Sequence, residues 1–216
     1  MSQQSGSDIN PDQTLTVMAP QPPVGYTEET NDHLCRALFF RSMLQAEEYE
    51  QILELAEDPN LTEQFMELQR LLLPSFEQYM LCQTRLLAMN AESNWLIERL
   101  WAFGDIVSKQ YHHFELERVM GTQILTLENG QSLDWHGDLG GGLFATRKLT
   151  LLACLSAPEE YTGGHFELLA TTDSCARLDL GTVVIHPSFS VNRIHPVTGG
   201  RLRMLLSWLH GPSPFN

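Results

Sequence analysis

The sequence predicts an α+β fold in which N-terminal helices precede an antiparallel β-structure of the sandwich or jelly-roll type. Two patterns support this prediction. Up to about residue 110, apolar residues recur at the spacing of amphipathic helices. Beyond that point, short β-rich runs are separated by Asn-Gly and Gly-Gly turn signals. Helices followed by many short strands are typical of α+β architectures that contain a sandwich or jelly roll.

The chain is long enough for one sizeable hydrophobic core. It has 216 residues, of which 43% are hydrophobic and 19% charged, so a second full domain would leave both cores small. Residues 1–25 are rich in Pro, Gln and Ser and cannot bury enough apolar surface to offset the entropy of ordering. We therefore expect a flexible leader over residues 1–25 and a single domain over residues 26–216.

The charge of the chain restricts its partners. The formal net charge is -14, and the 13 Lys and Arg residues are spread along the sequence, whereas nucleic acids and anionic membranes require a basic surface. No apolar run approaches the roughly 20 residues of a membrane-spanning helix, and the N-terminus does not have the order of a signal peptide. We expect a cytoplasmic protein that binds neither nucleic acid nor membrane. Its four cysteines are expected to be free thiols.

Three helices are predicted in the first half of the chain. The first begins with a capping box of Ser42 and Gln45 and ends near residue 57, where an Asp-Pro pair follows. The second ends before the proline at position 74, and the third ends near residue 109. The third helix is expected to pack against a sheet through an apolar stripe of Leu96, Leu100, Phe103 and Val107.

The second half of the chain is predicted to form strands. Runs of β-forming residues there are short and bounded by turn residues, such as the pairs at positions 129–130, 163–164 and 199–200. The predicted strands cover residues 120–127, 148–156, 165–169, 182–186 and 202–209.

The segment DWHGD at residues 134–138 suggests a metal site. Successive side chains of an extended strand alternate sides, so His136 and Asp138 are predicted to point to the same face. An imidazole and a carboxylate on one face can share a metal ion. With a third ligand from a later strand, they would form the two-histidine, one-carboxylate triad that leaves positions open on a non-haem Fe(II).

Several segments, in order and at compatible spacing, resemble the prolyl-4-hydroxylase-like branch of the Fe(II)/2-oxoglutarate-dependent dioxygenases. The resemblance covers roughly residue 38 to the C-terminus. The segments are QSLDWHGD (131–138), RKLTLL (147–152), LSAPEEYTGG (155–164), PSF (187–189), PVT (196–198) and WLHGP (208–212).

This resemblance implies a double-stranded β-helix, or jelly roll, with flanking N-terminal helices. It also implies an oxidoreductase that uses Fe(II) as cofactor and 2-oxoglutarate as co-substrate to hydroxylate an unactivated carbon of a small molecule or peptide. The distal carboxylate of 2-oxoglutarate requires a cation deep in the barrel, and the planar fork of arginine is suited to that role. Arg201 and Arg203 are the arginines of the final predicted strand.

The sequence departs from the family at three positions of the functional site. An ungapped match places Asn192 where the family has its third metal ligand, a histidine, and leaves His195 three residues further on. The same match places Leu202 where the family has the carboxylate-binding Arg or Lys. A tyrosine that commonly assists in binding the co-substrate is replaced by Leu127 or one of its neighbours.

Two interpretations remain open. In the first, a bulge or shortened loop before the final strand shifts the chain by an odd number of residues. His195 then completes the metal site with His136 and Asp138, and Arg203 or Arg201 binds 2-oxoglutarate. In the second, the ungapped register holds, and the fold serves a 2-oxoglutarate-independent activity or acts as a non-catalytic binding protein. We favour the first, because an intact metal pair makes most sense with a third ligand.

The remaining histidines are interpreted as structural. His165 and His186 fall in predicted strands, where a single histidine is more often hydrogen-bonded than metal-bound. His112, His113 and His210 lie outside or at the ends of the predicted elements. We expect these three to lie near the surface.

Overall fold

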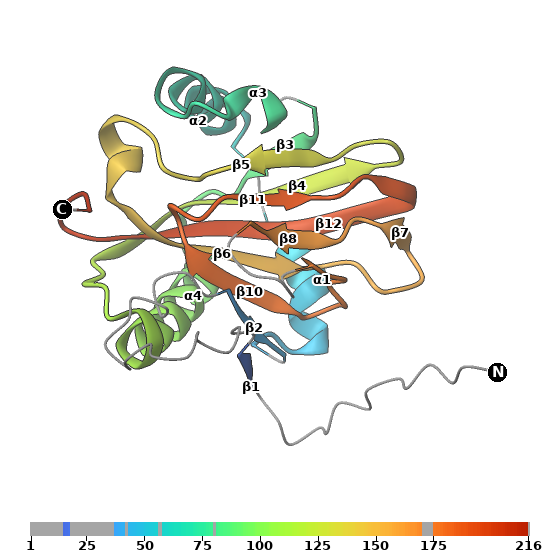
Figure 1. Cartoon of the computed structure of the whole chain (residues 1–216), viewed down its shortest axis with the longest axis horizontal. Coiled ribbons are helices and arrows are strands. Elements are labelled where there is room, and N and C mark those ends of the chain that lie inside the picture. The colour runs from blue at the N-terminus through green and yellow to red at the C-terminus, as the bar shows by residue number, and fades with distance from the viewer. Residues whose placement is uncertain are drawn as a thin grey trace, which may run out of the picture.

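The computed structural model describes residues 15–17, 37–41, 43–55, 58–79, 81–169 and 175–215. These residues form two antiparallel sheets that face each other, with helices packed outside them (Figure 1). In spatial order, the larger sheet consists of β1 (Leu15–Val17), β2 (Leu38–Phe40), β10 (Val183–Pro187), β6 (Arg147–Cys154), β12 (Val197–His210), β4 (Arg118–Glu128) and β3 (Gln83–Leu86), and β7 (Tyr161–Gly163) pairs with β12. The smaller sheet consists of β5 (Leu133–His136), β11 (Asn192–Ile194), β8 (Phe166–Leu168) and β9 (Cys175–Ala176). Helices followed by two facing antiparallel sheets confirm the predicted α+β jelly-roll architecture.

Three helices occur where the sequence predicts them, with local differences at their ends. They are α1 (Ala46–Glu54), α2 (Pro59–Leu72) and α4 (Asn94–Val107), and the short α3 (Phe76–Tyr79) follows α2. The capping box of α1 is formed by Gln45 and Glu48, and Ser42, predicted as its first residue, lies outside the described residues. The carboxylate of Asp58 accepts hydrogen bonds from the backbone N–H groups of Asn60 and Leu61, so the Asp-Pro pair starts α2. The first helix ends earlier than predicted, at Glu54, and residues 56–57 lie outside the described residues.

Strand alternation divides the core into two clusters. On β6, Leu152 and Cys154 belong to the cluster between the two sheets, whereas Leu151 and Ala153 belong to the cluster on the outer face of the larger sheet. The buried stripe of α4, which includes Leu96 and Leu100, packs in the outer cluster as predicted. The inner cluster therefore belongs to the barrel, and any residue assigned to the barrel site must point into it.

Some predictions differ from the structure in detail. Residues 15–17, within the predicted leader, pair with β2 as an edge strand, and the rest of residues 1–25 lies outside the described residues. His112 and His210, expected near the surface, are each 1% exposed. His210 is buried because it ends β12 between the neighbouring strands β4 and β6, where its Nδ1 lies 2.9 Å from Thr146 Oγ1.

Two further predictions concern membrane spans and thiols. None of the described helices is long and apolar enough to cross a membrane. Cys82, Cys154 and Cys175 form no disulfide among the described residues, in line with the prediction, and Cys35 lies outside these residues. Burial raises the pKa of the Cys82 thiol to about 11.

Candidate metal centre

The predicted metal pair lies between the two sheets. His136 is the last residue of β5, Asp138 follows two residues later, and both side chains are buried, with 5% and 1% exposed. Together with Thr150, His186 and Asn192 they line a small cavity of about 10 Å³. The remaining wall of this cavity, which we call the barrel cavity, is apolar and consists of Leu125, Leu133, Leu152, Phe166, Ile194 and Leu206.

Backbone contacts orient the imidazole of His136. Its Nδ1 lies 2.7 Å from the carbonyl oxygen of Asp134. A carbonyl can only accept a hydrogen bond, so Nδ1 of the neutral ring carries the proton and Nε2 keeps its lone pair. The side chain is therefore held in the tautomer that a metal ligand at Nε2 requires.

Asp138 is fixed through both its carboxylate and its backbone. Oδ2 accepts a hydrogen bond of 3.0 Å from Thr150 Oγ1 and lies 3.4 Å from Asn192 Nδ2. The carbonyl oxygen of Asp138 accepts a 2.9 Å hydrogen bond from Arg147, and its N–H donates to Ser188 O at 3.0 Å. Such outer contacts orient a ligating carboxylate. Thr150 was not identified from the sequence, although a single polar residue in the apolar run of β6 is a usable signal.

Asn192 occupies the third position of the site. It pairs with His136 across β5 and β11, and its Nδ2 lies 3.4 Å from both His136 O and Asp138 Oδ2. Asn192 and Ile194 are buried and line the barrel cavity, as expected because residues two positions apart on a strand point to the same face. The ungapped register is therefore the one that the structure adopts.

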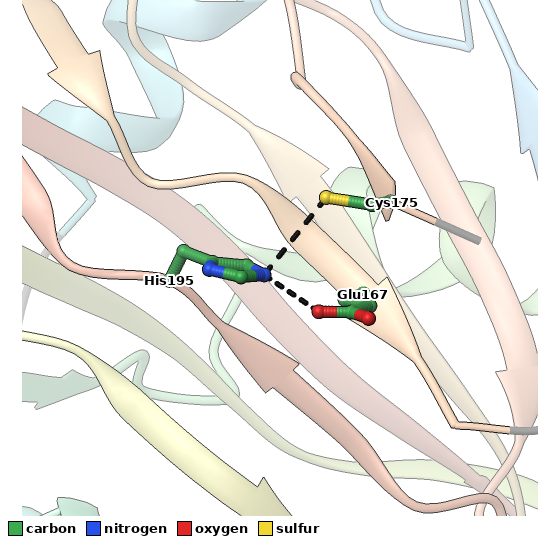
Figure 2. A group of neighbouring side chains, drawn as sticks. All are labelled: Glu167, Cys175 and His195. Carbon is green, nitrogen blue, oxygen red and sulfur yellow. Dashed lines mark hydrogen bonds and ion pairs between the residues drawn. The ribbon is translucent and has the colours of Figure 1, made fainter. Parts of the chain in front are cut away.

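The structure does not bring His195 to His136 and Asp138, contrary to the interpretation that we favoured. Because Asn192 and Ile194 point inward, the alternation turns the side chain of His195 to the outer face of the smaller sheet. There its Nε2 lies 2.6 Å from Glu167 Oε2 and 3.9 Å from Cys175 Sγ (Figure 2). A register shift that completes the family's ligand set is absent from this part of the chain.

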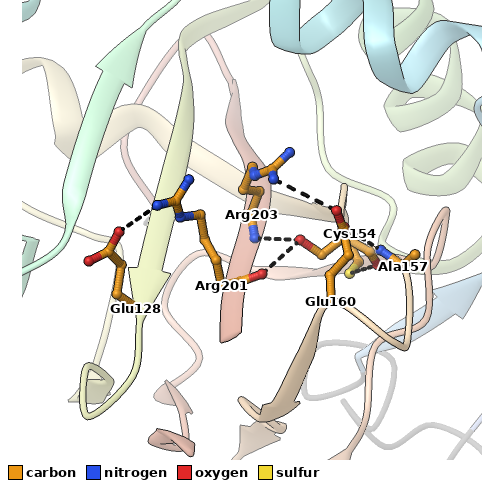
Figure 3. Close-up of polar contacts among 7 residues, drawn as sticks. Glu128, Cys154, Ala157, Glu160, Arg201 and Arg203 are labelled. Atoms are coloured by element: carbon orange, nitrogen blue, oxygen red, sulfur yellow. Dashed lines mark hydrogen bonds and ion pairs between the residues drawn. The ribbon is translucent and has the colours of Figure 1, made fainter. Parts of the chain in front are cut away.

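The two arginines expected to bind 2-oxoglutarate also point away from the barrel cavity. Arg201 Nη2 lies 3.0 Å from Glu128 Oε1, and Arg203 Nη2 lies 3.7 Å from Glu160 Oε1 (Figure 3). Both arginines line a separate cavity of about 220 Å³ on the outer face of the larger sheet. Leu202, between them, is fully buried in the inner cluster.

His186 is a second buried histidine of the barrel cavity. Its Nδ1 lies 3.0 Å from the carbonyl oxygen of Pro187, and burial lowers its pKa below the ordinary value. It does not complete a compact ligand set with the metal pair. Among the His, Cys, Asp and Glu side chains that the structure describes, one group of three has its ligand atoms within 4.8 Å of one another, and that group is Glu167, Cys175 and His195.

The donor set fits Fe(II) but does not fit 2-oxoglutarate in the usual pose of the family. An imidazole, a carboxylate and an amide oxygen are all ligands that Fe(II) accepts, and His136, Asp138 and Asn192 line the same cavity. Asn192 directs its Nδ2 toward Asp138 Oδ2, so its carboxamide would have to turn over to offer the oxygen. However, no Arg or Lys lines the barrel cavity among the described residues, and its volume of about 10 Å³ suffices for a single water or ion. A five-carbon dianion would need both a larger space and a cation.

Comparison with solved structures identifies the fold. The chain superposes on a viral collagen prolyl hydroxylase from Paramecium bursaria Chlorella virus-1 with a TM-score of 0.57 and 16% identity, covering 81% of this chain and 95% of that one. A prolyl-4-hydroxylase from Pseudomonas putida gives a TM-score of 0.56 and 13% identity, with coverage of 82% and 93%. The fold is therefore the jelly roll of the 2-oxoglutarate and Fe(II)-dependent oxygenases.

Sequence comparison finds partial matches to curated hydroxylases. The chain is 33% identical over 85 residues to a PKHD-type hydroxylase from Gloeothece citriformis, which covers 38% of this chain and 39% of the relative. A PKHD-type hydroxylase from Hyphomonas neptunium is 36% identical over 63 residues, or 28% of each chain. No family model matches the sequence. The chain thus resembles the prolyl-hydroxylase-like branch, and it spans about two fifths or less of the length of these relatives.

Proposed function

We propose that this protein is a non-haem Fe(II) oxygenase that oxidises a small molecule or peptide, with iron held by His136, Asp138 and the amide oxygen of Asn192. The position of Asn192 supports the proposal, because Asn192 pairs with His136 and its Nδ2 lies 3.4 Å from Asp138 Oδ2. If the carboxamide turns over, it offers its oxygen as a donor beside the imidazole and the carboxylate. Fe(II) would supply the redox chemistry by which this class oxidises unactivated carbon.

The residues around the proposed ligands have defined roles. The carbonyl of Asp134 holds the His136 ring in the ligating tautomer, and the hydroxyl of Thr150 holds the Asp138 carboxylate. The apolar wall of the barrel cavity keeps bulk water from the metal and strengthens the attraction between the ion and Asp138. We assign no role in this site to His195, Arg201 or Arg203.

We further propose that 2-oxoglutarate is not the co-substrate in the pose that the family uses. Leu202 fills the position of the cation, and placing a carboxylate against this apolar wall without a charged partner would cost several kcal/mol. The same apolar filling favours a second candidate function, a binding protein in which the metal pair serves only the fold. Dependence of the activity on iron separates the two candidates.

The test is an anaerobic titration with Fe(II), with and without 2-oxoglutarate, followed by measurement of oxygen consumption. The wild type is expected to bind one Fe(II) and to show no charge-transfer absorption when 2-oxoglutarate is added. Asn192→His should bind Fe(II) at least about 10-fold more tightly, because imidazole is a stronger donor than an amide. Unchanged iron binding in His136→Ala would contradict the proposed metal site. A 2-oxoglutarate-dependent absorption in the wild type would contradict the proposal that 2-oxoglutarate is not the co-substrate.

A further inference from the structure

Three metal-binding side chains converge on the outer face of the smaller sheet, away from the barrel cavity. They are Glu167 on β8, Cys175 on β9 and His195 just after β11, and we call them the outer cluster. Their ligand atoms all lie within 4.8 Å of one another, and Figure 2 shows the three side chains meeting at the Nε2 atom of His195. Cys175 is exposed and the other two side chains are partly exposed, so an ion can reach the cluster from solvent.

The arrangement is not that of a nucleophilic Cys-His-Glu triad. In such a triad, one ring nitrogen of the histidine faces the nucleophile and the other faces the carboxylate. Here the same atom, His195 Nε2, lies 2.6 Å from Glu167 Oε2 and 3.9 Å from Cys175 Sγ. One nitrogen cannot serve both partners in a proton relay, whereas convergence of three donors on one point is what a metal ion requires.

We propose that the outer cluster binds a thiophilic divalent cation, with Zn²⁺ as the best match. Thiolate, imidazole and carboxylate are its preferred protein ligands, and three such ligands with a water molecule form a common zinc site. Tetrahedral zinc with ordinary bond lengths separates its N, O and S donors by about 3.3–3.6 Å. The Nε2 to Sγ distance must therefore close by a few tenths of an ångström, and the hydrogen bond between His195 and Glu167 must open.

Neighbouring residues already hold the proposed ligands in place. The Nε of Arg193 donates to Glu167 Oε2 at 2.7 Å, and its guanidinium lies 4.3 Å from the centre of the Trp135 ring. The N–H of His195 donates to the carbonyl oxygen of His165 at 2.8 Å. The arginine orients the carboxylate in the way that outer-shell partners orient ligands in known metal sites. The backbone hydrogen bond fixes the main chain that carries the imidazole.

The proposed site has a structural consequence for β9. This strand pairs with β8 at two positions, Phe166 with Ala176 and Glu167 with Cys175, and so short a ladder contributes little stability. A cation bound by residues of β8, β9 and the end of β11 would fasten β9 to the sheet. The proposal is independent of the function proposed for the barrel cavity, because the two sets of ligands lie on opposite faces of the smaller sheet.

The test is Zn²⁺ binding to the full-length protein by equilibrium dialysis, in an Asp138→Asn background that disables the barrel cavity. One Zn²⁺ per chain is expected, and Cys175→Ser or His195→Gln should weaken its affinity at least about 10-fold, the loss that even an outer-shell change can cause. Cys82→Ser is the matched control, because it changes a buried thiol elsewhere and should bind Zn²⁺ as the background does.

Cobalt substitution provides a readout specific to the ligands. Co²⁺ bound at the outer cluster should show thiolate-to-metal charge-transfer absorption that Cys175→Ser abolishes. Zn²⁺ should also protect Cys175 from alkylation in the background protein, as mapped by mass spectrometry, which does not depend on how a variant folds. The proposal fails if Co²⁺ gives no such absorption, if the absorption survives in Cys175→Ser, or if Zn²⁺ does not slow alkylation of Cys175.

Discussion

The Asp138→Asn substitution tests the metal site of the barrel cavity while preserving the shape of the side chain. Asp138 is 1% exposed, so a smaller residue would leave a void, whereas the amide oxygen of asparagine can still accept the hydrogen bond from Thr150. Mn²⁺ is a suitable probe because it uses the ligands of Fe(II) without its redox chemistry and avoids thiolates. The substitution therefore removes the charge of one ligand and little else.

The size of the effect follows from binding linkage. At 100 times the dissociation constant, Mn²⁺ should raise the free energy of unfolding of the wild type by about 2.7 kcal/mol, which corresponds to roughly 5–10 °C in Tm for a chain of this size. A 100-fold weaker affinity in Asp138→Asn reduces the gain at the same concentration to about 0.4 kcal/mol. Scanning calorimetry in EDTA and in Mn²⁺ measures both values.

The matched control is Asp134→Asn, which makes the same change at an exposed carboxylate of β5. Its side chain accepts the N–H of Trp135, and its backbone carbonyl, which orients His136, is unaltered. This variant should keep the full metal-induced shift. Equal shifts in the wild type and Asp138→Asn, or no shift in the wild type at millimolar Mn²⁺, would refute the assignment.

Two further predictions concern residues outside the proposed ligand set. Arg201→Ala and Arg203→Ala should each change the free energy of unfolding by less than about 1 kcal/mol, because both ion pairs are solvent-accessible. Both variants should also keep the Mn²⁺-induced rise in Tm. Loss of that rise would show that the arginines act at the metal site. Burial, aided by the charges of Arg147 and Arg118, lowers the pKa of His210 to about 4. As pH falls from about 6.5 to 4, the imidazole of His210 takes up a proton in the unfolded chain and not in the folded chain. The free energy of unfolding of the wild type should therefore fall by up to about 3 kcal/mol more than that of His210→Gln. Urea unfolding at the two pH values measures both falls, and equal falls in the two proteins would contradict the assignment.

The sequence was sufficient to locate most of the helices and strands and to place His136 and Asp138 together at one cavity. Helical spacing located α1, α2 and α4, and β-rich runs located β4, β6, β8, β10 and β12. Strand β11 was not located, although β8 is equally short, because no Gly-Gly or Asn-Gly pair precedes β11 as the pair at 163–164 precedes β8. The outer cluster was also not predicted, because Glu167, Cys175 and His195 become neighbours only through the pairing of β8 with β9 and β11.

His195 was expected beside His136 and Asp138, and the strand geometry explains why the structure places it elsewhere. We expected the strand register to shift once by an odd number of residues between Asn192 and the final strand, whereas the structure has two such shifts. Ile194 and Val197 both point into the inner cluster although they are three residues apart, and Val197 and Leu202 both do so although they are five apart. An irregularity in the pairing of β12 with β7 accompanies the second shift, at Val197 to Gly199. The two shifts cancel, so Leu202 faces inward, as Asn192 does.

The two departures from the family both face the space between the sheets: Asn192 lines the barrel cavity, and Leu202 lies in the inner cluster that surrounds it. Asn192 weakens the ligand set, and Leu202 removes the cation and joins the apolar packing of Met204 and Leu206. A single reversion would not restore the family's chemistry. Asn192→His would strengthen only the metal site, and an arginine at position 202 would bury a guanidinium among apolar side chains, which is strongly unfavourable without a paired carboxylate. The missing cation at Leu202 thus disfavours an anionic co-substrate, and under the proposed function the barrel cavity suits a metal ion with small, uncharged partners.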